Sequence, residues 1–310
     1  MNILITGAGG YIGRQLGERL ARTHNVIGVD VRAAADLPFA LHVMDIRDAA
    51  IGDLMKQHGI THVVHLAAVL EDSGDRARDY DIDVNGTRNV LEGCVAAGVQ
   101  HITVTSSGAA YGYHADNPEW LRETDALRGN PEFAYADHKR QVEAMLAEYR
   151  ERVPALQQLV LRIGTVLGDK TDNLITRLFQ RKRLLSIRGS ASPFVFIWDQ
   201  DLVSIIEQGV SNSQAGIYNV AGDGALTVHE LAHLLGKPVL SLPAWILKAV
   251  LAIGHALRLT RYGPAQVNFL RYRPVLLNEK LKTDFGYQPR KSSREAFEFY
   301  VTHARQRGAL

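Results

Sequence analysis

The first thirteen residues, MNILITGAGGYIG, constrain the fold of this chain more than any other stretch. The apolar run Ile3–Ile5 predicts a strand, and a helical pattern begins directly after the glycines. Gly7 allows a tight turn, Gly10 lets the backbone approach a pyrophosphate, and Gly13 lets the helix lie close to the sheet. The helix N-terminus offers unpaired N–H groups and a partial positive charge, which bind phosphate. We therefore expect a phosphate-binding loop; the alternative is a glycine-rich turn with no ligand.

Apolar runs alternate with helical patterns along the chain, which is typical of βαβ units. The pattern predicts an α/β fold, a doubly wound parallel (Rossmann) sheet with helices on both faces. The expected strands are Ile3–Ile5, Val26–Val29, Leu41–Val43, His62–Leu66, Ile102–Thr105 and Leu159–Ile163. Ligands bind at the carboxyl ends of such strands, so the site should lie among Thr6, Asp30, Asp45, Ala67 and Ser106–Ser107.

Asp30 ends the second expected strand, about twenty residues beyond the glycine loop. An acid at this position accepts hydrogen bonds from the adenosine ribose hydroxyls and repels a 2′-phosphate, which favours NAD over NADP. Arg32 keeps NADP open as an alternative, and a solvated loop acid is the simpler interpretation of Asp30.

Tyr135 and Lys139 lie four residues apart in a helical pattern that runs from Phe133 to Tyr149, so both project from one face. A lysine ammonium near a phenol favours the phenolate, which lets the phenol exchange a proton near neutral pH. A surface helix is the usual explanation for this spacing. The hydroxyls of Thr105–Ser107, at the end of the preceding strand, make the catalytic interpretation stronger.

The composition excludes several classes of protein. The net charge of +2 argues against nucleic acid as a partner, and the single cysteine, Cys94, excludes an intrachain disulfide. The first strand begins near residue 2 with no signal peptide before it, so we expect a cytoplasmic protein. The longest apolar stretch, Leu242–Leu257, is too short for a membrane span and contains charged residues. We expect this helix to be buried; lining an apolar pocket or resting on a membrane surface are the alternatives.

Taken together, the motifs resemble the extended short-chain dehydrogenase/reductase superfamily, in its NAD-dependent epimerase/dehydratase branch. The resemblance covers nearly the whole chain. The matching motifs are Thr6–Gly13, Asp45–Ile46, His65–Ala68, Asn85–Asn89, Ser106–Gly112, Tyr135 with Lys139, Tyr218–Gly222 and Phe285–Pro289.

The resemblance implies a role for each matching residue. Tyr135 would move a proton to or from a substrate oxygen, Lys139 would activate Tyr135 and hold the nicotinamide ribose, and Ser107 would hold the same substrate oxygen. The expected cofactor-binding residues are Gly7, Gly10, Tyr11, Ile12, Gly13, Asp30, Asp45, Ile46, Leu66, Ala67, Ala68, Asn85, Tyr135 and Lys139.

The resemblance also implies an organisation of the chain. Residues 1–163 would form the dinucleotide-binding domain, to which 192–224 return. Residues 164–191 and 225–310 would form a smaller, mainly helical substrate-binding region. The helices at Asp79–Ala97 and Phe133–Arg150 would pair with those of a second copy in a homodimer.

Several positions depart from the family pattern. No Asp-Glu pair follows Ser107, which argues against dehydration. Thr165 and Leu167 stand where nucleotide-sugar enzymes usually have asparagine and tyrosine, and Ser192–Val195 lacks their usual arginine. These changes put a UDP-sugar substrate in doubt. Substitute contacts could come from Arg181, Lys182, Arg183, Arg188, Arg271 and Arg273, although charge runs usually face solvent.

Three functions fit this sequence. The first is an NAD-dependent oxidoreductase that acts on a secondary alcohol or ketone of a small molecule. The second is a nucleotide-sugar 4-epimerase, and the third is a non-catalytic NAD-binding regulator. The intact set of Ser107, Tyr135 and Lys139 argues against the third.

Two histidine patterns resemble metal sites. His229–His233 fits H-E-x-x-H, but no third ligand stands out downstream, and the segment coincides with a family helix. His62 and His65 lie three apart on a strand and therefore point to opposite faces. We expect no metal.

Overall fold

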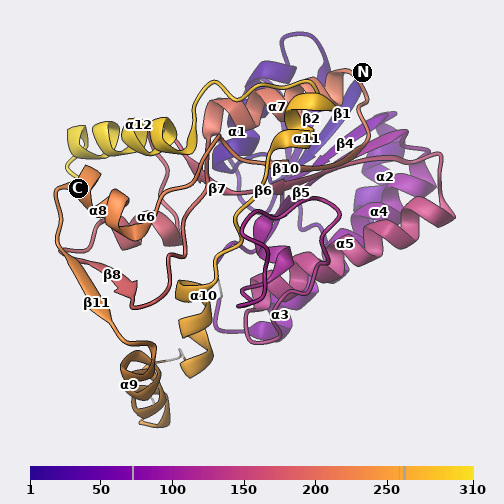
Figure 1. Ribbon diagram of the computed structural model, residues 1–310. Helices are drawn as coiled ribbons and strands as arrows, with labels where there is room; N and C mark the ends of the chain where they lie inside the picture. The colour runs from indigo at the N-terminus through magenta and orange to yellow at the C-terminus, as the bar shows by residue number, and fades with distance from the viewer. Residues whose placement is uncertain (72, 258, 261–262) are drawn as a thin grey trace.

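Seven parallel strands form the central sheet of the computed structural model, which describes residues 1–71, 73–257, 259–260 and 263–310. Across the sheet the order is β10 (Gly216–Val220), β6 (Gln157–Ile163), β5 (His101–Ser107), β4 (His62–His65), β1 (Asn2–Thr6), β2 (Asn25–Asp30) and β3 (Ala40–Val43). The prediction of a doubly wound parallel sheet is confirmed (Figure 1).

Helices cover both faces of this sheet. One face carries α1 (Tyr11–Leu20) and α7 (Asp199–Ser211); the other carries α2 (Ala50–Gln57), α4 (Gly86–Ala97) and α5 (Ala134–Arg152). Successive residues of β1 divide between the two cores, because side chains alternate along a strand: Ile3 and Ile5 pack under α1, and Leu4 packs on the opposite side. Burial on both faces explains why the strands read as continuous apolar runs.

The position of β1 determines where a ligand can bind. β1 pairs with β2 on one side and with β4 on the other. The chain therefore proceeds outward from β1 first toward β3 and then, after crossing back, toward β10. The connections at the carboxyl ends of β1 and β4 diverge, which opens a crevice between them.

The segment that contains the helix expected at Asp79–Ala97 is not one regular α-helix in the structure. It consists of α3 (Arg76–Tyr80), a π-helical turn at Asp81–Asn85, and α4. Asp83 lies in this turn, where its carboxylate accepts hydrogen bonds from the backbone N–H of Val69 (2.7 Å) and bonds the His138 ring (2.9 Å). These contacts hold the loop after β4 and α5 together.

Most of the rest of the chain forms a smaller lobe on one side of the sheet (Figure 1). Its own core contains aromatic rings, with Phe179, Phe196 and Phe297 packed closely together. Its helices and strands are β7 (Thr165–Leu167), α6 (Leu174–Phe179), β8 (Leu184–Ile187), β9 (Phe196–Trp198), α8 (Val228–Leu235), β11 (Val239–Leu242), α9 (Ala244–Ala256), α10 (Val267–Arg271) and α12 (Ser293–Gln306). Helix α11 (Glu279–Thr283) instead packs against β10 of the central sheet.

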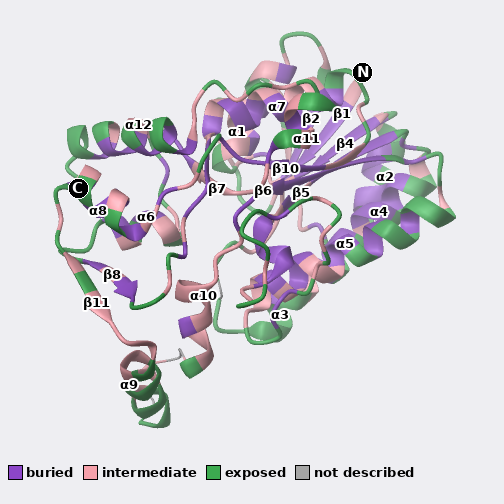
Figure 2. Ribbon diagram, in the orientation of Figure 1, coloured by how far each residue is buried: buried purple, intermediate pink, exposed green. Residues whose placement is uncertain are grey.

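The expected burial of Leu242–Leu257 is wrong. Helix α9 occupies most of this stretch, and none of its residues, all of which the structure describes, is buried. Trp245 is 71% exposed and Ile253 is 61% exposed. The helix projects from the lower end of the smaller lobe, away from the sheet (Figures 1 and 2). An apolar sequence predicts burial only when the fold supplies a surface to cover the helix, and the described part of this chain does not supply one.

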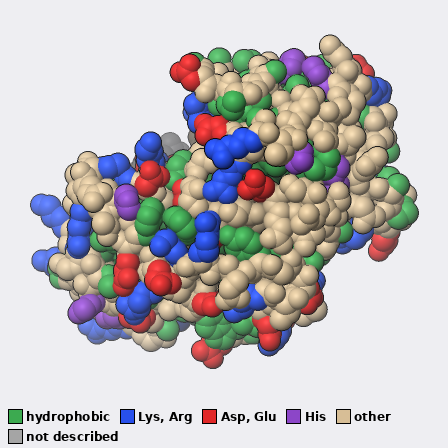
Figure 3. Space-filling view, turned by 90° about the horizontal axis from the view of Figure 1, so that it is seen from above, with side chains coloured by type: hydrophobic (Ala, Val, Ile, Leu, Met, Phe, Trp, Pro, Cys, Tyr) green, Lys and Arg blue, Asp and Glu red, His purple; other side chains and the backbone are tan. Residues whose placement is uncertain are grey.

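Acidic and basic side chains are interspersed on the face seen from above (Figure 3). Ion pairs link neighbouring helices: Arg294 of α12 pairs with Glu230 of α8 (3.1 Å), and Arg19 of α1 pairs with Glu207 of α7 (3.4 Å). Exposed pairs of this kind add little stability.

A buried ion pair, by contrast, connects α5 to the sheet. Glu143 of α5 and Arg162 of β6 form a bidentate pair, with 2.7 Å between Oε2 and Nη2, and both side chains are about 5% exposed. Ser106 donates to the same carboxylate (2.5 Å). Burial alone would lower the pKa of Arg162, but its bonds to Glu143 raise the pKa above the ordinary value.

Replacing Glu143 with Gln should therefore destabilise the fold strongly. The variant leaves the Arg162 charge buried without its counter-ion, which costs about 3–5 kcal/mol of the free energy of unfolding, measured by urea denaturation. The matched control is Asp116→Asn, which removes the exposed pair with Arg128 and should leave the urea midpoint unchanged. Equal shifts for the two variants would contradict this interpretation.

Candidate functional site

The glycine loop joins β1 to α1 in a conformation that other residues would not tolerate. Gly7 has φ of +71°, and its N–H donates to the carbonyl of Val29 (2.8 Å). A Cβ atom on Gly13 would lie 2.2 Å from the Gly7 carbonyl oxygen, so only glycine lets α1 approach the loop this closely. No side chain caps the N-terminus of α1 at Gly10. Its first N–H groups are therefore available to an anion.

A cleft of about 910 Å³ opens beside this loop at the carboxyl ends of the strands. Eight predicted cofactor residues line it: Gly7, Gly10, Asp30, Asp45, Ile46, Leu66, Ala67 and Ala68. The cleft is also lined by residues that the sequence did not predict, among them Arg14, Met44, Ser73, Arg78 and Asp79. The lining does not include the other predicted cofactor residues or the catalytic candidates, namely Tyr11, Ile12, Gly13, Asn85, Ser107, Tyr135 and Lys139.

Asp30 supports the glycine loop and also faces the cleft. One carboxylate oxygen accepts the N–H of Gly9 (3.0 Å), and the other accepts the N–H of Arg32 (3.0 Å). The carboxylate therefore lies at the end of β2, beside the loop that would hold the pyrophosphate. A dinucleotide fits this arrangement: a glycine loop, a helix N-terminus with no side-chain cap, an acid at the end of the next strand and a cleft of this volume.

Asp45 and Ile46 follow β3 at the far end of the cleft. Arg47 forms an ion pair with Asp45 (2.7 Å) and a second one with Asp81 (2.8 Å). The hydrogen bond from Arg47 lowers the pKa of Asp45 below its usual range. Ile46 is buried against Gly86, where a Cβ would lie 2.7 Å from the Ile46 side chain. This contact explains the glycine at the start of α4.

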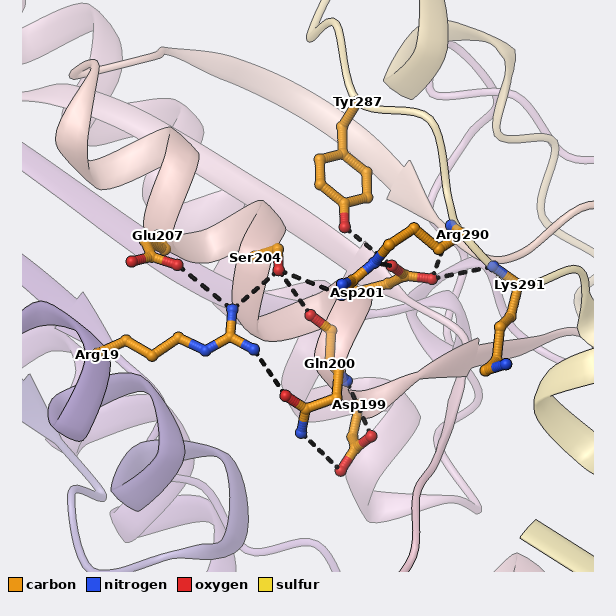
Figure 4. Close-up of polar contacts among 9 residues, drawn as sticks. All are labelled: Arg19, Asp199, Gln200, Asp201, Ser204, Glu207, Tyr287, Arg290 and Lys291. Carbon is orange, nitrogen blue, oxygen red and sulfur yellow. Dashed lines mark hydrogen bonds and ion pairs between the residues drawn. The ribbon is translucent and has the colours of Figure 1, made fainter. Parts of the chain in front are cut away.

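The Tyr11 hydroxyl points toward the smaller lobe. It donates to Asp199 (2.5 Å) and Asp169 (3.2 Å). Burial and the Asp199 carboxylate raise the pKa of this phenol. Asp199 begins α7, whose first turn anchors other segments, as Figure 4 shows for Asp201 with Tyr287 and Arg290. In this structure Tyr11 connects the two parts of the chain.

Helix α5 brings Lys139 and Tyr135 to the end of β5. The Lys139 ammonium donates to the carbonyl of Thr105 (2.8 Å) and lies 5.7 Å from the centre of the Tyr135 ring. Ser107, two residues beyond Thr105 on the same strand, accepts the N–H of Ala109 (3.1 Å) and so caps a short 3₁₀ turn. Tyr135 and Ser107 are half-buried, whereas Lys139 is 8% exposed. The three residues therefore converge on one strand end.

His65 has a structural role that its sequence motif does not reveal. Its two ring nitrogens bond the hydroxyls of Thr6 (2.7 Å) and Thr87 (2.9 Å), which ties β1, β4 and α4 together beside the cleft. Full burial, with a smaller contribution from the nearby Lys139 charge, lowers the pKa of His65 to about 3. The imidazole is therefore neutral at physiological pH.

An aromatic cluster surrounds the start of α5 on the side of the smaller lobe. The Tyr113 ring packs against Phe133 (5.4 Å between centroids) and against Phe269 of α10 (5.0 Å). Burial and the neighbouring Tyr135 raise the pKa of Tyr113. These contacts place α10 next to the start of α5, which carries Tyr135, although the two helices are more than 100 residues apart in the sequence.

Arg273 is a half-buried basic residue beside this cluster. Its guanidinium lies 3.8 Å from the centre of the Phe194 ring and donates to the Ser192 carbonyl (3.0 Å) and hydroxyl (2.9 Å). Its Nε is buried without a hydrogen-bond partner, and no carboxylate among the described residues pairs with it. Burial lowers its pKa to about 10, so it stays cationic at neutral pH. Of the six basic candidates, Arg181, Lys182, Arg183 and Arg188 are exposed.

The H-E-x-x-H motif has a structural explanation in α8. Glu230 accepts the backbone N–H of Thr227 (2.8 Å), while the Thr227 side chain accepts the N–H of Glu230, which is a capping box. Within the described ranges, no group of three or more His, Cys, Asp or Glu side chains could hold a metal ion.

The glycine cradle and the cleft beside Asp30 define a dinucleotide-binding protein of the Rossmann type. Residues 3–221 match the NAD dependent epimerase/dehydratase family, and the chain belongs to that family. The predicted resemblance is confirmed, and NAD is the cofactor, as expected.

Relatives of known sequence or structure agree with this family. An uncharacterized protein of Mycobacterium tuberculosis is 25% identical over 315 residues, which cover 96% of this chain and 82% of that protein. The N-acetyl-alpha-D-glucosaminyl-diphospho-ditrans,octacis-undecaprenol 4-epimerase of Escherichia coli O157:H7 is 27% identical over 237 residues, or 74% of this chain and 70% of the relative. The UDP-glucose 4-epimerase of Thermotoga maritima superposes with a TM-score of 0.78 at 21% identity, over 99% of each chain.

His65 should make the stability of the fold depend on pH. The unfolded state binds a proton with a pKa of about 6.5, whereas the folded state binds it only near pH 3. The contribution of a neutral His65 is therefore complete above pH 6.5 and is lost as the pH falls toward 3. Between pH 7 and 5, the free energy of unfolding of the His65→Asn variant should fall by about 2 kcal/mol less than that of the parent. His229→Asn, on the exposed face of α8, is the matched control; an identical fall in the parent and in His65→Asn would refute the prediction.

Proposed function

We propose that this chain transfers hydride to or from a secondary alcohol or ketone carbon of a small-molecule substrate, with Tyr135, Lys139 and Ser107 as the catalytic residues. The observation that supports this most strongly is the convergence of Tyr135 and the nearly buried Lys139 on the end of β5. Bound NAD supplies the hydride acceptor or donor.

Proton transfer would pass through Tyr135. In the oxidation direction, the substrate hydroxyl gives its proton to the phenolate oxygen of Tyr135 while the carbon–hydrogen bond gives up its electron pair as hydride. Lys139 supports the phenolate because its ammonium lies near the ring and is held there by the Thr105 carbonyl. The Ser107 hydroxyl holds the substrate oxygen. His65 is neutral and fully engaged by two threonines, so it does not compete for the proton.

Arg273 supports a second candidate, a 4-epimerase that acts on a sugar joined to a diphosphate. A half-buried guanidinium with a buried, unpartnered Nε and no carboxylate partner among the described residues suits an anionic substrate group. It lies over Phe194, in the segment where the usual arginine is missing from the sequence. Two of the relatives named above are 4-epimerases by title.

The two candidates differ in what happens to the cofactor. An epimerase reduces the intermediate that it has just oxidised, so it retains NAD and produces no net NADH. A dehydrogenase exchanges NAD readily and accumulates NADH with substrate. The absorbance of the protein as purified and NADH formation with a screen of alcohols and sugar nucleotides separate the two.

Replacing Tyr135 with Phe should lower turnover by about 10²–10⁴, the usual effect of a positioned acid or base, without weakening cofactor binding. The matched control is Tyr149→Phe, the same change further along α5 on the buried side, which should keep the parent rate. Steady-state kinetics on the substrate found by the screen, together with NAD titration, give both values. A Tyr135→Phe variant that turns over at the parent rate would remove the proton-transfer role and leave the non-catalytic regulator as the better hypothesis.

Lys139→Met should impair both turnover and NAD affinity, because its ammonium is assigned both to Tyr135 and to the nicotinamide ribose. Lys56→Met, on the exposed face of α2, is the control and should change neither value. NAD titration and steady-state kinetics test the two effects separately. A variant that loses turnover but binds NAD with unchanged affinity would contradict the assigned contact between Lys139 and the nicotinamide ribose.

We also propose that the chain is a homodimer formed through α4 and α5. The outer surfaces of these helices carry small or apolar exposed residues, including Val95, which is 42% exposed, and Ala144 and Ala147. Light scattering should give twice the chain mass of 34.2 kDa, and Val95→Asp with Ala147→Asp should give the monomer. A parent protein that is monomeric at micromolar concentration would overturn the proposal.

A further inference from the structure

Helix α9 presents an apolar face with nothing packed over it in the described part of the chain. Trp245, Ala249, Ile253 and Ala256 recur every three or four residues and are all exposed, so they form one continuous stripe along the helix. Leu257, directly after the helix, is 63% exposed. Single exposed apolar residues are ordinary, but a helical stripe of this length is typical of an interaction surface.

The segments that build this end of the molecule are basic and contain no acidic residue. Residues 231–278 hold six Lys or Arg, residues 174–198 hold five, and neither segment contains Asp or Glu. The remainder of the chain carries 24 basic and all 33 acidic residues, so the positive excess is confined to these two segments. They meet in space, because β8 pairs with β11 immediately before α9. The face in Figure 3, where both signs of charge are interspersed, is different in character.

Basic groups also flank the apolar stripe itself. Lys248 and His255 are exposed and, two helical turns apart, lie along one edge of α9. A helix with an apolar face that contains tryptophan, with lysine at its border, matches the pattern of helices that lie in the plane of a membrane surface. No helix in the described ranges is long and apolar enough to cross a membrane.

We propose that α9 docks the protein onto the surface of an anionic lipid bilayer. The apolar stripe enters the boundary between headgroups and acyl chains, and the surrounding Lys and Arg side chains meet the lipid phosphates. A second copy of this chain is a poorer occupant, because it would bring the basic segments 174–198 and 231–278 of both copies together. Helix α9 contacts α10, and Phe269 of α10 packs on Tyr113. Docking would therefore hold the side of the smaller lobe that faces the start of α5 near the membrane.

Vesicle binding tests this proposal. The purified chain is mixed with vesicles of phosphatidylcholine and phosphatidylglycerol, or of phosphatidylcholine alone, and co-sedimentation is measured with increasing salt. We expect binding to the mixed vesicles, weakened by salt, with a blue shift of tryptophan fluorescence because Trp245 leaves water. Trp245→Ser combined with Ile253→Ser should reduce the affinity at least tenfold, and Lys248→Glu should reduce it as well.

Matched controls separate docking from general effects. Val43→Ser removes an equally exposed apolar side chain (62%) from β3, and Lys56→Glu reverses a charge on α2; both should bind vesicles like the parent. Circular dichroism should show the same fold for all variants. The proposal fails if the parent does not bind, or if the Trp245/Ile253 variant binds equally well. It also fails if that variant only converts a dimer to a monomer, or if α9 mediates binding to duplex DNA but not to vesicles.

Discussion

The close contact between α1 and the loop before it is the constraint on which the cofactor site depends. With no side chain at Gly13, the helix comes within reach of the Gly7 carbonyl, a position that any Cβ would block. The N-terminus of α1 is thereby held beside the ends of β1 and β2, with no side chain capping its N–H groups. In the adjoining loop, the N–H of Gly9 donates to the Asp30 carboxylate. The positive end of one helix and the negative charge of Asp30 then face the same cleft, an arrangement that suits a phosphate at the helix and a ribose at the carboxylate.

Helix α5 plays the corresponding part on the catalytic side. Three of its polar residues are tied to the sheet or the π turn: Lys139 to Thr105, Glu143 to Arg162, and His138 to Asp83. Polar groups in these buried positions are costly unless every one is paired, so the helix can occupy only one register on the sheet. That register determines where the Tyr135 ring lies relative to the Lys139 ammonium.

The smaller lobe contains two kinds of group that lack a partner within the described residues: a polar atom of Arg273 and the apolar side chains of α9. Around α10 it holds a half-buried arginine, Arg273, with an unpartnered Nε beside the aromatic cluster, an environment that favours an anion. At α9 it does the opposite and leaves apolar side chains in water. Both arrangements cost free energy in the isolated chain. A ligand at the first and a lipid surface at the second would each recover that cost.

The sequence by itself determined the parallel sheet, the family, and the glycine loop and Asp30 of the cofactor cleft. The continuous apolar runs, the glycine spacing and Asp30 are local signals, whose physical causes lie within a few residues of one another. Only the tertiary structure decided the fate of α9, because the apolar sequence of a helix does not reveal whether the fold has a surface to cover it. The same holds for the π turn, for His65 between Thr6 and Thr87, and for Arg273 over Phe194. Each of these depends on partners tens of residues away, and only the packed chain brings them together.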